Sequence, residues 1–128
     1  MAVFEVVPVF HVVNLAASLR HYTEVLGFEI RFQYGDSYAG VQRDKAQVHL
    51  SATVPSRHPP GNGSAYFFCD DVDAYFEEVK GKGATIIAEL QNYDYGMRDF
   101  GMTDPDGNSL SFGQEIKEET TQSTLPIN

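Results

Sequence analysis

The 128-residue chain contains the same series of secondary-structure signals twice, and this repeat limits its possible folds more than any other feature. In the first half, the apolar run Phe10–Val13 is followed by Asn14 and by apolar residues at helical spacing that end at Gly27. In the second half, Phe67–Cys69 is followed by Asp70–Asp71 and a second run of this kind. Asn and Asp cap the free N–H groups of a helix, and Gly tolerates the left-handed backbone that ends one. Each half therefore begins with a strand and a helix.

Runs typical of strands follow each predicted helix. They are Phe28–Tyr34, Ser37–Arg43 and Ala46–Ala52 in the first half, and Ala84–Leu90, Asp99–Thr103 and Asn108–Gln114 in the second. The last two runs are joined by Asp104–Asn108, in which Pro105 presets φ and Gly107 accepts a positive φ. The pattern predicts an α+β fold made of two βαβββ modules.

Composition sets the module boundaries and the class of partner. The modules span residues 1–54 and 64–115, the Pro- and Gly-rich stretch 55–63 is a linker, and the polar tail at 116–128 is expected to be disordered. The net charge of −9 argues against nucleic acid as a partner. We expect no membrane association, because no run of apolar residues is long enough to span a bilayer. The single cysteine fits a reducing, cytoplasmic location.

Alternation along the strands assigns side chains to the two faces of the sheet. One face is apolar and is expected to pack against the helices. The other carries side chains that are too polar for a core and too aromatic for an ordinary surface, including His11, His49, Tyr66, Phe68 and Ser111. This mixture favours a ligand-binding cleft over a plain solvent-facing sheet, which is the alternative.

Two segments resemble a known family. The stretch Asn14–Phe28 is similar to the opening helix of the glyoxalase/bleomycin-resistance/dioxygenase group, the vicinal oxygen chelate superfamily, and Tyr95–Phe100 with Asp104–Asn108 resembles its closing hairpin. The resemblance covers about Val6 to Gln114 and includes the duplication. It implies a curved, eight-stranded mixed sheet around a cavity. It also implies a homodimer, because in many members the cavity is completed across subunits.

Metal-dependent members of this family hold the ion with four ligands, usually His and Glu. The resemblance places the corresponding positions at Val7, His49, Ser64 and Ser111. His49 alone is a good metal ligand, because serine hydroxyls bind divalent ions poorly. We therefore expect neither a metal nor another cofactor. A displaced metal site that uses His11, His49 and Glu5 is the alternative.

The metal-free branch of the family includes bleomycin-resistance proteins, which sequester a drug without transforming it. By this resemblance we predict a small-molecule binding protein whose ligand is antibiotic-like or a metabolite, and planar or cationic, because aromatic rings stack on planar groups and attract cations. The expected ligand-binding residues are His11, Phe32, Tyr38, His49, Tyr66, Phe68, Tyr93, Tyr95, Arg98, Phe100 and Ser111. For Arg98, a simple ion pair with Asp99 or Asp104 is the alternative role.

Catalysis is the competing prediction. A glyoxalase-like lyase or isomerase, or a dioxygenase, would use a displaced metal site. Metal-free catalysis would use His11 or His49 as a general base. The sequence lacks a recognisable set of nucleophile, base and orienting group, so no catalytic residue is assigned.

Overall fold

A computed structural model describes residues 1–117 of the chain. It confirms the predicted α+β fold, with the eight strands arranged as two four-stranded mixed sheets. The first module consists of β1 (Val9–His11), α1 (Leu15–Arg20), the π-helical turn η1 (His21–Val25), β2 (Glu29–Tyr34), β3 (Tyr38–Arg43) and β4 (Ala46–Ser51). The second consists of β5 (Ser64–Phe68), α2 (Val72–Gly81), β6 (Thr85–Asn92), β7 (Met97–Thr103) and β8 (Ser109–Glu115). Both βαβββ units are present as expected.

The helices begin at the capping residues that the sequence predicts. The Asn14 side chain accepts a hydrogen bond of 2.9 Å from the backbone N–H of Ala17. Asp71 accepts one of 3.1 Å from the N–H of Ala74 in the same way. Each cap satisfies a backbone donor that has no partner within its helix.

The sheets have equivalent strand orders, β1-β4-β3-β2 and β5-β8-β7-β6. In each sheet the first strand pairs in parallel and the others pair antiparallel. The registers also correspond: Val9, His49, Gly40 and Phe32 form one row across the first sheet, and Tyr66, Ser111, Gly101 and Ala88 form one row across the second. The duplication therefore extends to individual rows of residues.

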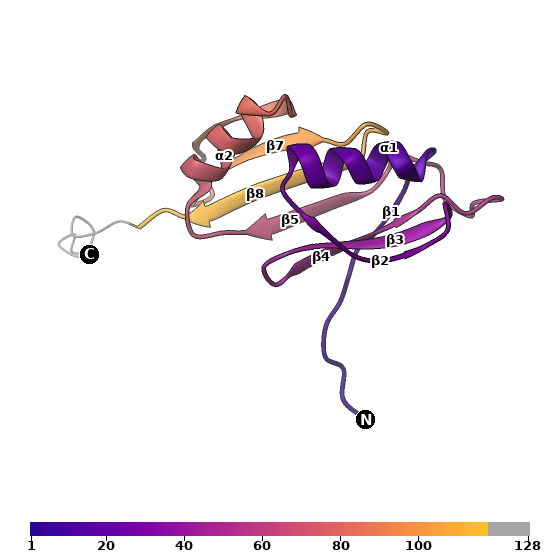
Figure 1. The fold of residues 1–128 in the computed structure, drawn as a ribbon. Coiled ribbons are helices and arrows are strands. Elements are labelled where there is room, and N and C mark those ends of the chain that lie inside the picture. Colours follow the sequence, from indigo (N-terminus) through magenta and orange to yellow (C-terminus); the bar gives the residue numbers. More distant parts are fainter. Residues whose placement is uncertain (118–128) are drawn as a thin grey trace.

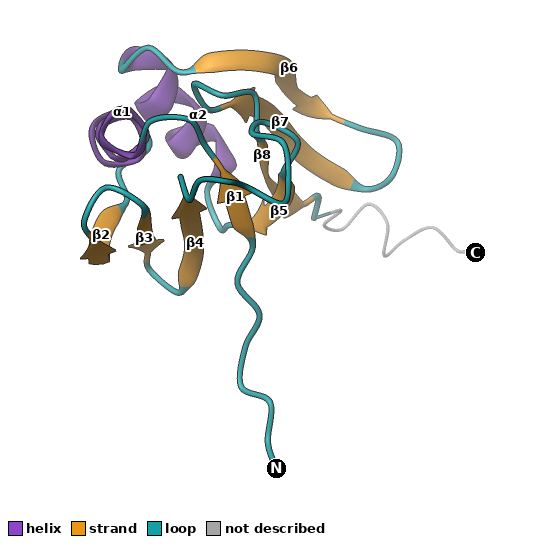
Figure 2. Ribbon diagram, turned by 90° about the vertical axis from the view of Figure 1, so that its right-hand side faces the viewer, coloured by secondary structure: helices purple, strands orange, loops and turns teal. Residues whose placement is uncertain are grey.

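Helix α1 packs on β3 and β4, whereas α2 packs on β6, β7 and β8 (Figure 1). The helix-covered faces of the two modules share one core, in which the Phe28 and Phe67 rings meet at 6.4 Å between centroids. The Tyr75 hydroxyl on α2 donates a hydrogen bond of 2.8 Å to the carbonyl of Leu26 in the first module. Figure 2 shows both helices in the angle between the sheets, so the uncovered faces of the two sheets point away from one another.

The predicted turn at Asp104–Asn108 is confirmed, and it also ties the second module to the first. Gly107 has φ 104°, and its N–H donates to the Asp104 carbonyl at 3.1 Å. The buried Tyr22 hydroxyl donates to Asp104 Oδ2 at 3.0 Å, and Asn108 Nδ2 donates to the His11 carbonyl at 3.2 Å. Polar groups of the turn thus hold the first strand and helix of the other module.

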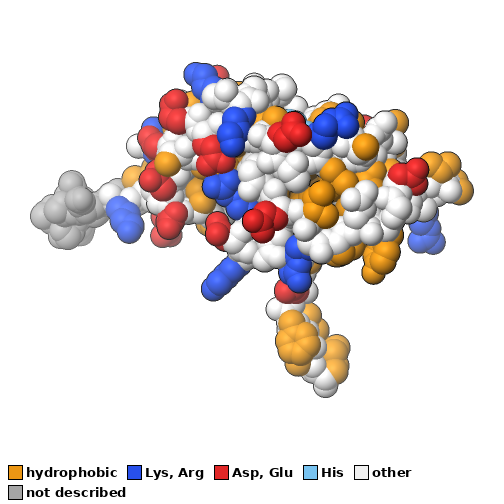
Figure 3. Space-filling model, viewed as in Figure 1, with side chains coloured by type: hydrophobic (Ala, Val, Ile, Leu, Met, Phe, Trp, Pro, Cys, Tyr) orange, Lys and Arg blue, Asp and Glu red, His pale blue; other side chains and the backbone are white. Residues whose placement is uncertain are grey.

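The N-terminal residues 1–8 form an arm that extends away from the body (Figure 1). The arm carries apolar side chains that lie almost fully in solvent, among them Phe4, which is 90% exposed (Figure 3). The connection between the modules spans residues 52–63. Residues 118–128 of the predicted tail lie outside the described part of the chain. Within residues 1–117, no helix has the length and apolar character needed to cross a membrane.

Candidate ligand-binding surfaces

The uncovered face of the first sheet carries three rings in contact, Phe32, Tyr38 and His49, which we call the first-module cluster. The Tyr38 hydroxyl lies 2.9 Å from Nδ1 of His49. The Phe32 ring meets the His49 ring edge-on at 5.1 Å and lies nearly parallel to the Tyr38 ring at 6.2 Å between centroids. All three side chains are half-buried, and partial burial raises the pKa of Tyr38. The cluster therefore offers solvent a rigid aromatic surface with a polar edge.

A glycine in the middle of the first sheet allows this arrangement. Gly40 lies between Phe32 and His49 in the same row of the sheet. A Cβ atom at Gly40 would overlap the Phe32 ring, so the ring lies flat across the space that a side chain would fill. Glycine inside a strand is typical of such close approaches.

The uncovered face of the second sheet carries the second-module cluster, Tyr66, Phe68, Tyr95 and Asp99. Asp99 is 5% exposed, and its carboxylate accepts hydrogen bonds from two phenols. Tyr66 donates to Oδ2 at 2.7 Å, and Tyr95 donates to Oδ2 at 2.8 Å, with Oδ1 at 3.1 Å. Partial desolvation and the bond to Asp99 raise the pKa of Tyr66, and the same two causes raise the pKa of Tyr95 to about 12. The phenols thus remain protonated donors at neutral pH.

A second glycine gives Tyr66 its path to Asp99. Strand β8 lies between the strands of these two residues, and Gly113 is the β8 residue paired with Asp99. A Cβ atom at Gly113 would overlap the Tyr66 hydroxyl and lie 2.7 Å from the Asp99 Cβ. The Phe68 ring packs beside Tyr66 at 5.2 Å between centroids. The two modules therefore use the same device, in which a ring lies over a glycine of a neighbouring strand.

Two further predicted residues lie beside the second-module cluster. The Tyr93 ring stacks on Tyr95, with centroids 5.4 Å apart and 5° between the planes. Ser111 is half-buried and pairs with Tyr66 in the row of the sheet described above. Tyr93 extends the aromatic surface of the cluster, and Ser111 adds a hydroxyl group beside it.

His11 is placed against the linker and away from the other predicted residues. Its ring lies 4.8 Å from that of His58, and its Nδ1 is 3.4 Å from the Ser56 hydroxyl. Desolvation, and secondly the charge of His58, lower the pKa of His11. Its contacts favour a structural role at the end of β1.

Two of the predicted ligand-binding residues, Arg98 and Phe100, lie on the helix-covered side of the second sheet. Arg98 makes a bidentate hydrogen bond with Asp73 of α2, at 2.7 and 3.0 Å, and does not pair with Asp99 or Asp104. Phe100 is 1% exposed and packs edge-on against Phe76. Because Asp99 faces outward, alternation turns both of its neighbours to the helix-covered side.

Asp99 is not among the predicted ligand-binding residues, although the alternation of side chains along its strand indicates its position. Phe100 and Met102 are the buried apolar residues of strand β7, and they occupy alternate positions. Because the side chains of a strand alternate, the residues one position away from Phe100 belong to the uncovered face. Asp99 therefore belongs to the same face as Tyr66, and its buried carboxylate is the main polar group of the second-module cluster.

The residues at the family's metal-ligand positions do not fit a metal ion. Nδ1 of His49 is engaged by Tyr38, and the residues beside His49 in the row are Val9 and Gly40. For the displaced alternative, the Glu5 carboxylate accepts a hydrogen bond of 3.0 Å from Gln47 and not from a histidine. Within residues 1–117, no group of three His, Cys, Asp or Glu side chains is arranged to hold an ion. A divalent cation needs several such donors.

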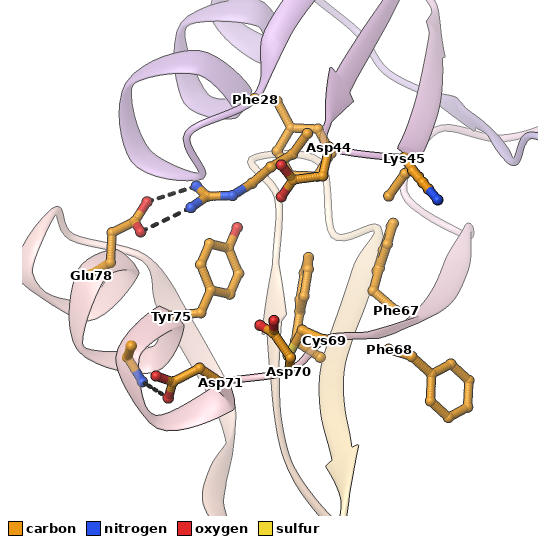
Figure 4. A pocket seen from close by; sticks show the side chains of 14 residues that line it. Phe28, Asp44, Lys45, Phe67, Phe68, Cys69, Asp70, Asp71, Tyr75 and Glu78 are labelled. Carbon is orange, nitrogen blue, oxygen red and sulfur yellow. Dashed lines mark hydrogen bonds and ion pairs between the residues drawn. The ribbon is translucent and has the colours of Figure 1, made fainter.

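A cleft of about 820 Å³ opens between the modules on the helix-covered side (Figure 4). Its walls come from the β3–β4 turn, the end of β5 and helix α2. Phe67 and Tyr75 form part of its apolar lining, and the ion pair between Arg43 and Glu78, 2.8 Å long, crosses one side. This cleft shares Phe68 with the second-module cluster, and none of the other predicted ligand-binding residues lines it.

Comparison with known proteins extends the resemblance. The chain shares 27% identity with the bleomycin-binding protein from Streptomyces verticillus, solved with copper(II)-bleomycin, at a TM-score of 0.71 over 91% of this chain and 100% of that one. It shares 25% identity with TnmS3, an antibiotic binding protein from Streptomyces sp. CB03234, at a TM-score of 0.77 over 91% and 99% of the chains. A lactoylglutathione lyase from Agrobacterium tumefaciens has the same fold at 17% identity, with a TM-score of 0.72 over 89% and 95%.

No curated protein matches the chain. The family model for the glyoxalase/bleomycin resistance protein/dioxygenase superfamily matches residues 7–112, which include both modules and the closing hairpin. The chain therefore belongs to the glyoxalase/bleomycin resistance protein/dioxygenase superfamily.

Proposed function

We propose that the protein binds a small organic molecule, antibiotic-like or a metabolite, on its uncovered sheet faces and without a metal ion. The observation that carries this proposal is the pair of aromatic clusters on those faces. Single exposed aromatic residues are common on protein surfaces, but here the tyrosine rings are fixed by hydrogen bonds to His49 and Asp99. Rigid aromatic surfaces provide a large contact area for a planar group at low cost in conformational entropy.

The relatives support this class of function. TnmS3 is an antibiotic binding protein, and the Streptomyces verticillus protein binds bleomycin. Both align with nearly the whole of the present chain. The single, half-buried Cys69 fits a reducing compartment, and we propose a cytoplasmic location on that ground.

We further propose that the binding site is completed in a homodimer. The two clusters lie on faces that point away from one another (Figure 2), so a ligand that touches both requires two copies of the chain. The apolar arm at residues 1–8 supports the same assembly, because Val3, Phe4 and Val6 gain free energy only when another surface covers them (Figure 3). In this dimer, each cavity has one wall from the first module of one copy and one wall from the second module of the other.

Isothermal titration with bleomycin, with and without copper(II), and with uncharged planar aromatic compounds tests the binding function. Phe32→Ala should weaken binding about tenfold, because an aromatic contact contributes about 0.5–1.5 kcal/mol beyond its buried area. Glu77→Ala, on the exposed side of α2, is the matched control and should leave affinity unchanged.

Two outcomes would contradict the binding function. One is the absence of saturable heat with every compound. The other is a near-stoichiometric content of zinc, nickel, manganese or iron in the purified protein that His49→Ala removes. The second outcome would favour a metal-dependent lyase, isomerase or dioxygenase.

Sedimentation velocity tests the dimer separately. The protein should sediment as a dimer at micromolar concentration, and Phe4→Asp should shift it toward monomer because a charge would be buried with the arm. Glu5→Gln, one position along the arm, is the control. A wild-type protein that sediments as a monomer would contradict the shared cavity.

A further inference from the structure

The Asp99 carboxylate is buried without an opposing charge. Within residues 1–117, the ion pairs are Arg43–Glu78 and Arg98–Asp73, and neither involves Asp99. Its partners are two neutral phenols, which solvate a negative charge but do not neutralise it. A buried and uncompensated charge is costly, so its presence on a surface with exposed aromatic rings needs a physical account.

Few basic residues belong to the second module. Between residues 64 and 117 they are Lys80, Lys82, Arg98 and Lys117. Lys80 lies on α2, Lys82 directly follows that helix, and Arg98 is turned to the helix-covered side. Asp94 and Glu115 are exposed near the end of the cluster, where Glu115 pairs with Met97 across the sheet, and the exposed Lys117 follows two residues later. Asp94, Asp99 and Glu115 together outweigh the one ammonium group of Lys117, so this end of the face has a net negative charge.

The aromatic rings around Asp99 suit a positive group. Tyr66 is 41% exposed and Tyr95 61%, and Phe68 stands beside Tyr66. A phenol that donates a hydrogen bond to a carboxylate becomes richer in electrons, which strengthens the attraction of its ring for a cation. A cation within about 6 Å of such a ring is attracted to it, and the attraction grows as the cation is desolvated.

We propose that Asp99, Tyr66 and Tyr95 form the subsite for a positively charged group of the ligand, of the substituted ammonium class. This inference rests on the proposed binding function and adds the charge of the ligand. The rings contact the alkyl groups around the cation, and the Asp99 carboxylate supplies the counter-charge below them. Alkylated ammonium groups are weakly hydrated and bind to aromatic cages by this combination.

A purely structural role for Asp99 predicts a different result, and a matched pair of probes separates the two. Choline and 3,3-dimethylbutan-1-ol have the same shape, but only choline is charged. Their affinities for the full-length protein are measured by NMR titration of backbone amides, together with those of an uncharged planar aromatic compound. Asp99→Asn keeps the size of the side chain and one acceptor for the phenols but removes the charge.

We expect choline to bind at least about tenfold more tightly than the alcohol, corresponding to about 1.4 kcal/mol, and to shift amides of β5, β7 and β8. Asp99→Asn should abolish this preference, because choline loses its counter-charge, and should weaken binding of the planar compound and of the alcohol by a smaller factor than it weakens binding of choline. Glu115→Gln removes one exposed charge from the same end of the face and is the control, expected to preserve most of the preference.

Equal binding of choline and the alcohol would overturn the inference, as would equal losses for the charged and uncharged probes in Asp99→Asn, which would show that Asp99 only positions the tyrosines. If the planar compound binds and choline does not, this inference fails while the proposed function stands. If no probe binds, both fail. Circular dichroism of each variant confirms that a loss of binding does not reflect unfolding.

Discussion

Asn108→Ala should destabilise the protein more than the size of the side chain suggests, because Asn108 connects three segments of the chain. It is fully buried in the turn between β7 and β8. Its Nδ2 donates to the His11 carbonyl at 3.2 Å and to Asp104 Oδ2 at 2.9 Å, while its Oδ1 accepts from the Gly63 N–H at 2.7 Å. The turn, the linker and β1 therefore all lose a partner when the amide is removed.

The expected loss follows from these three bonds. A hydrogen bond between neutral groups contributes about 0.5–1.5 kcal/mol to stability, and one to a charged group about 1.5–3 kcal/mol. Two neutral bonds and one bond to Asp104 give an expected loss of about 3–5 kcal/mol, which is a large share of the stability of a typical domain. Asn62→Ala is the matched control: Asn62 is exposed in the neighbouring loop, so its loss should stay within about 0.5 kcal/mol.

Urea unfolding followed by circular dichroism measures both variants. Because the inter-module core remains, the dependence of unfolding free energy on urea should keep its slope, and the midpoint alone should fall. A difference below about 1 kcal/mol between Asn108→Ala and Asn62→Ala would refute the reasoning that this amide joins the modules. Asn108→Asp gives a second check, since it places two carboxyl groups in contact. Its deficit relative to the wild type should shrink as the pH falls toward about 4, where one of them is protonated.

Three further outcomes follow from individual contacts. Gly113→Ala should push the Tyr66 hydroxyl away from Asp99, so that the raised pKa of Tyr66 falls toward 10. An ultraviolet titration of phenolate absorbance measures this pKa, and the absence of a fall would contradict the packing of Tyr66 over Gly113. Burial lowers the pKa of His21 from 6.5, and its buried Nε2 has no hydrogen-bond partner among residues 1–117. The contribution of this residue to stability is therefore complete above pH 6.5 and is lost as the pH falls through the folded-state pKa. His21→Gln should flatten this pH dependence, which thermal unfolding measures. Phe100→Ala should lower the free energy of unfolding in urea by about 3–5 kcal/mol, because it leaves a cavity in the core. The ligand preferences of the folded protein should not change. A selective effect on one ligand would instead show that Phe100 belongs to the binding site.

Local signals in the sequence predicted the elements well. Asn14 and Asp71 cap helices where expected, and Gly107 closes the predicted turn. Alternation also placed His49 and Tyr66 on the uncovered face, because a strand with one buried face has a fixed two-residue period. These features depend on neighbours a few residues apart, which the sequence displays directly.

The candidate site was predicted less well where residue type was given more weight than alternation. Arg98 and Phe100 looked suitable for ligand binding by their chemistry, but the period of β7 turns both to the helices and brings Asp99 outward. His11 has the expected alternation, but the linker folds back so that Ser56 and His58 contact it. Such contacts depend on how a loop returns to the sheet, which no local pattern specifies.

Gly40 and Gly113 have a consequence for selectivity. The strand surface is shallow at each glycine because no side chain projects there. An aromatic side chain from the neighbouring strand lies over that position, so the surface that faces a ligand is flat. A smooth wall attracts any flat molecule through dispersion forces and discriminates little among ring systems of similar area. The choice between compounds must then come from the few atoms at the edges that carry polarity, the imidazole in one module and the carboxylate in the other. Exchanging those two groups is therefore the most direct way to redirect the protein to a different compound.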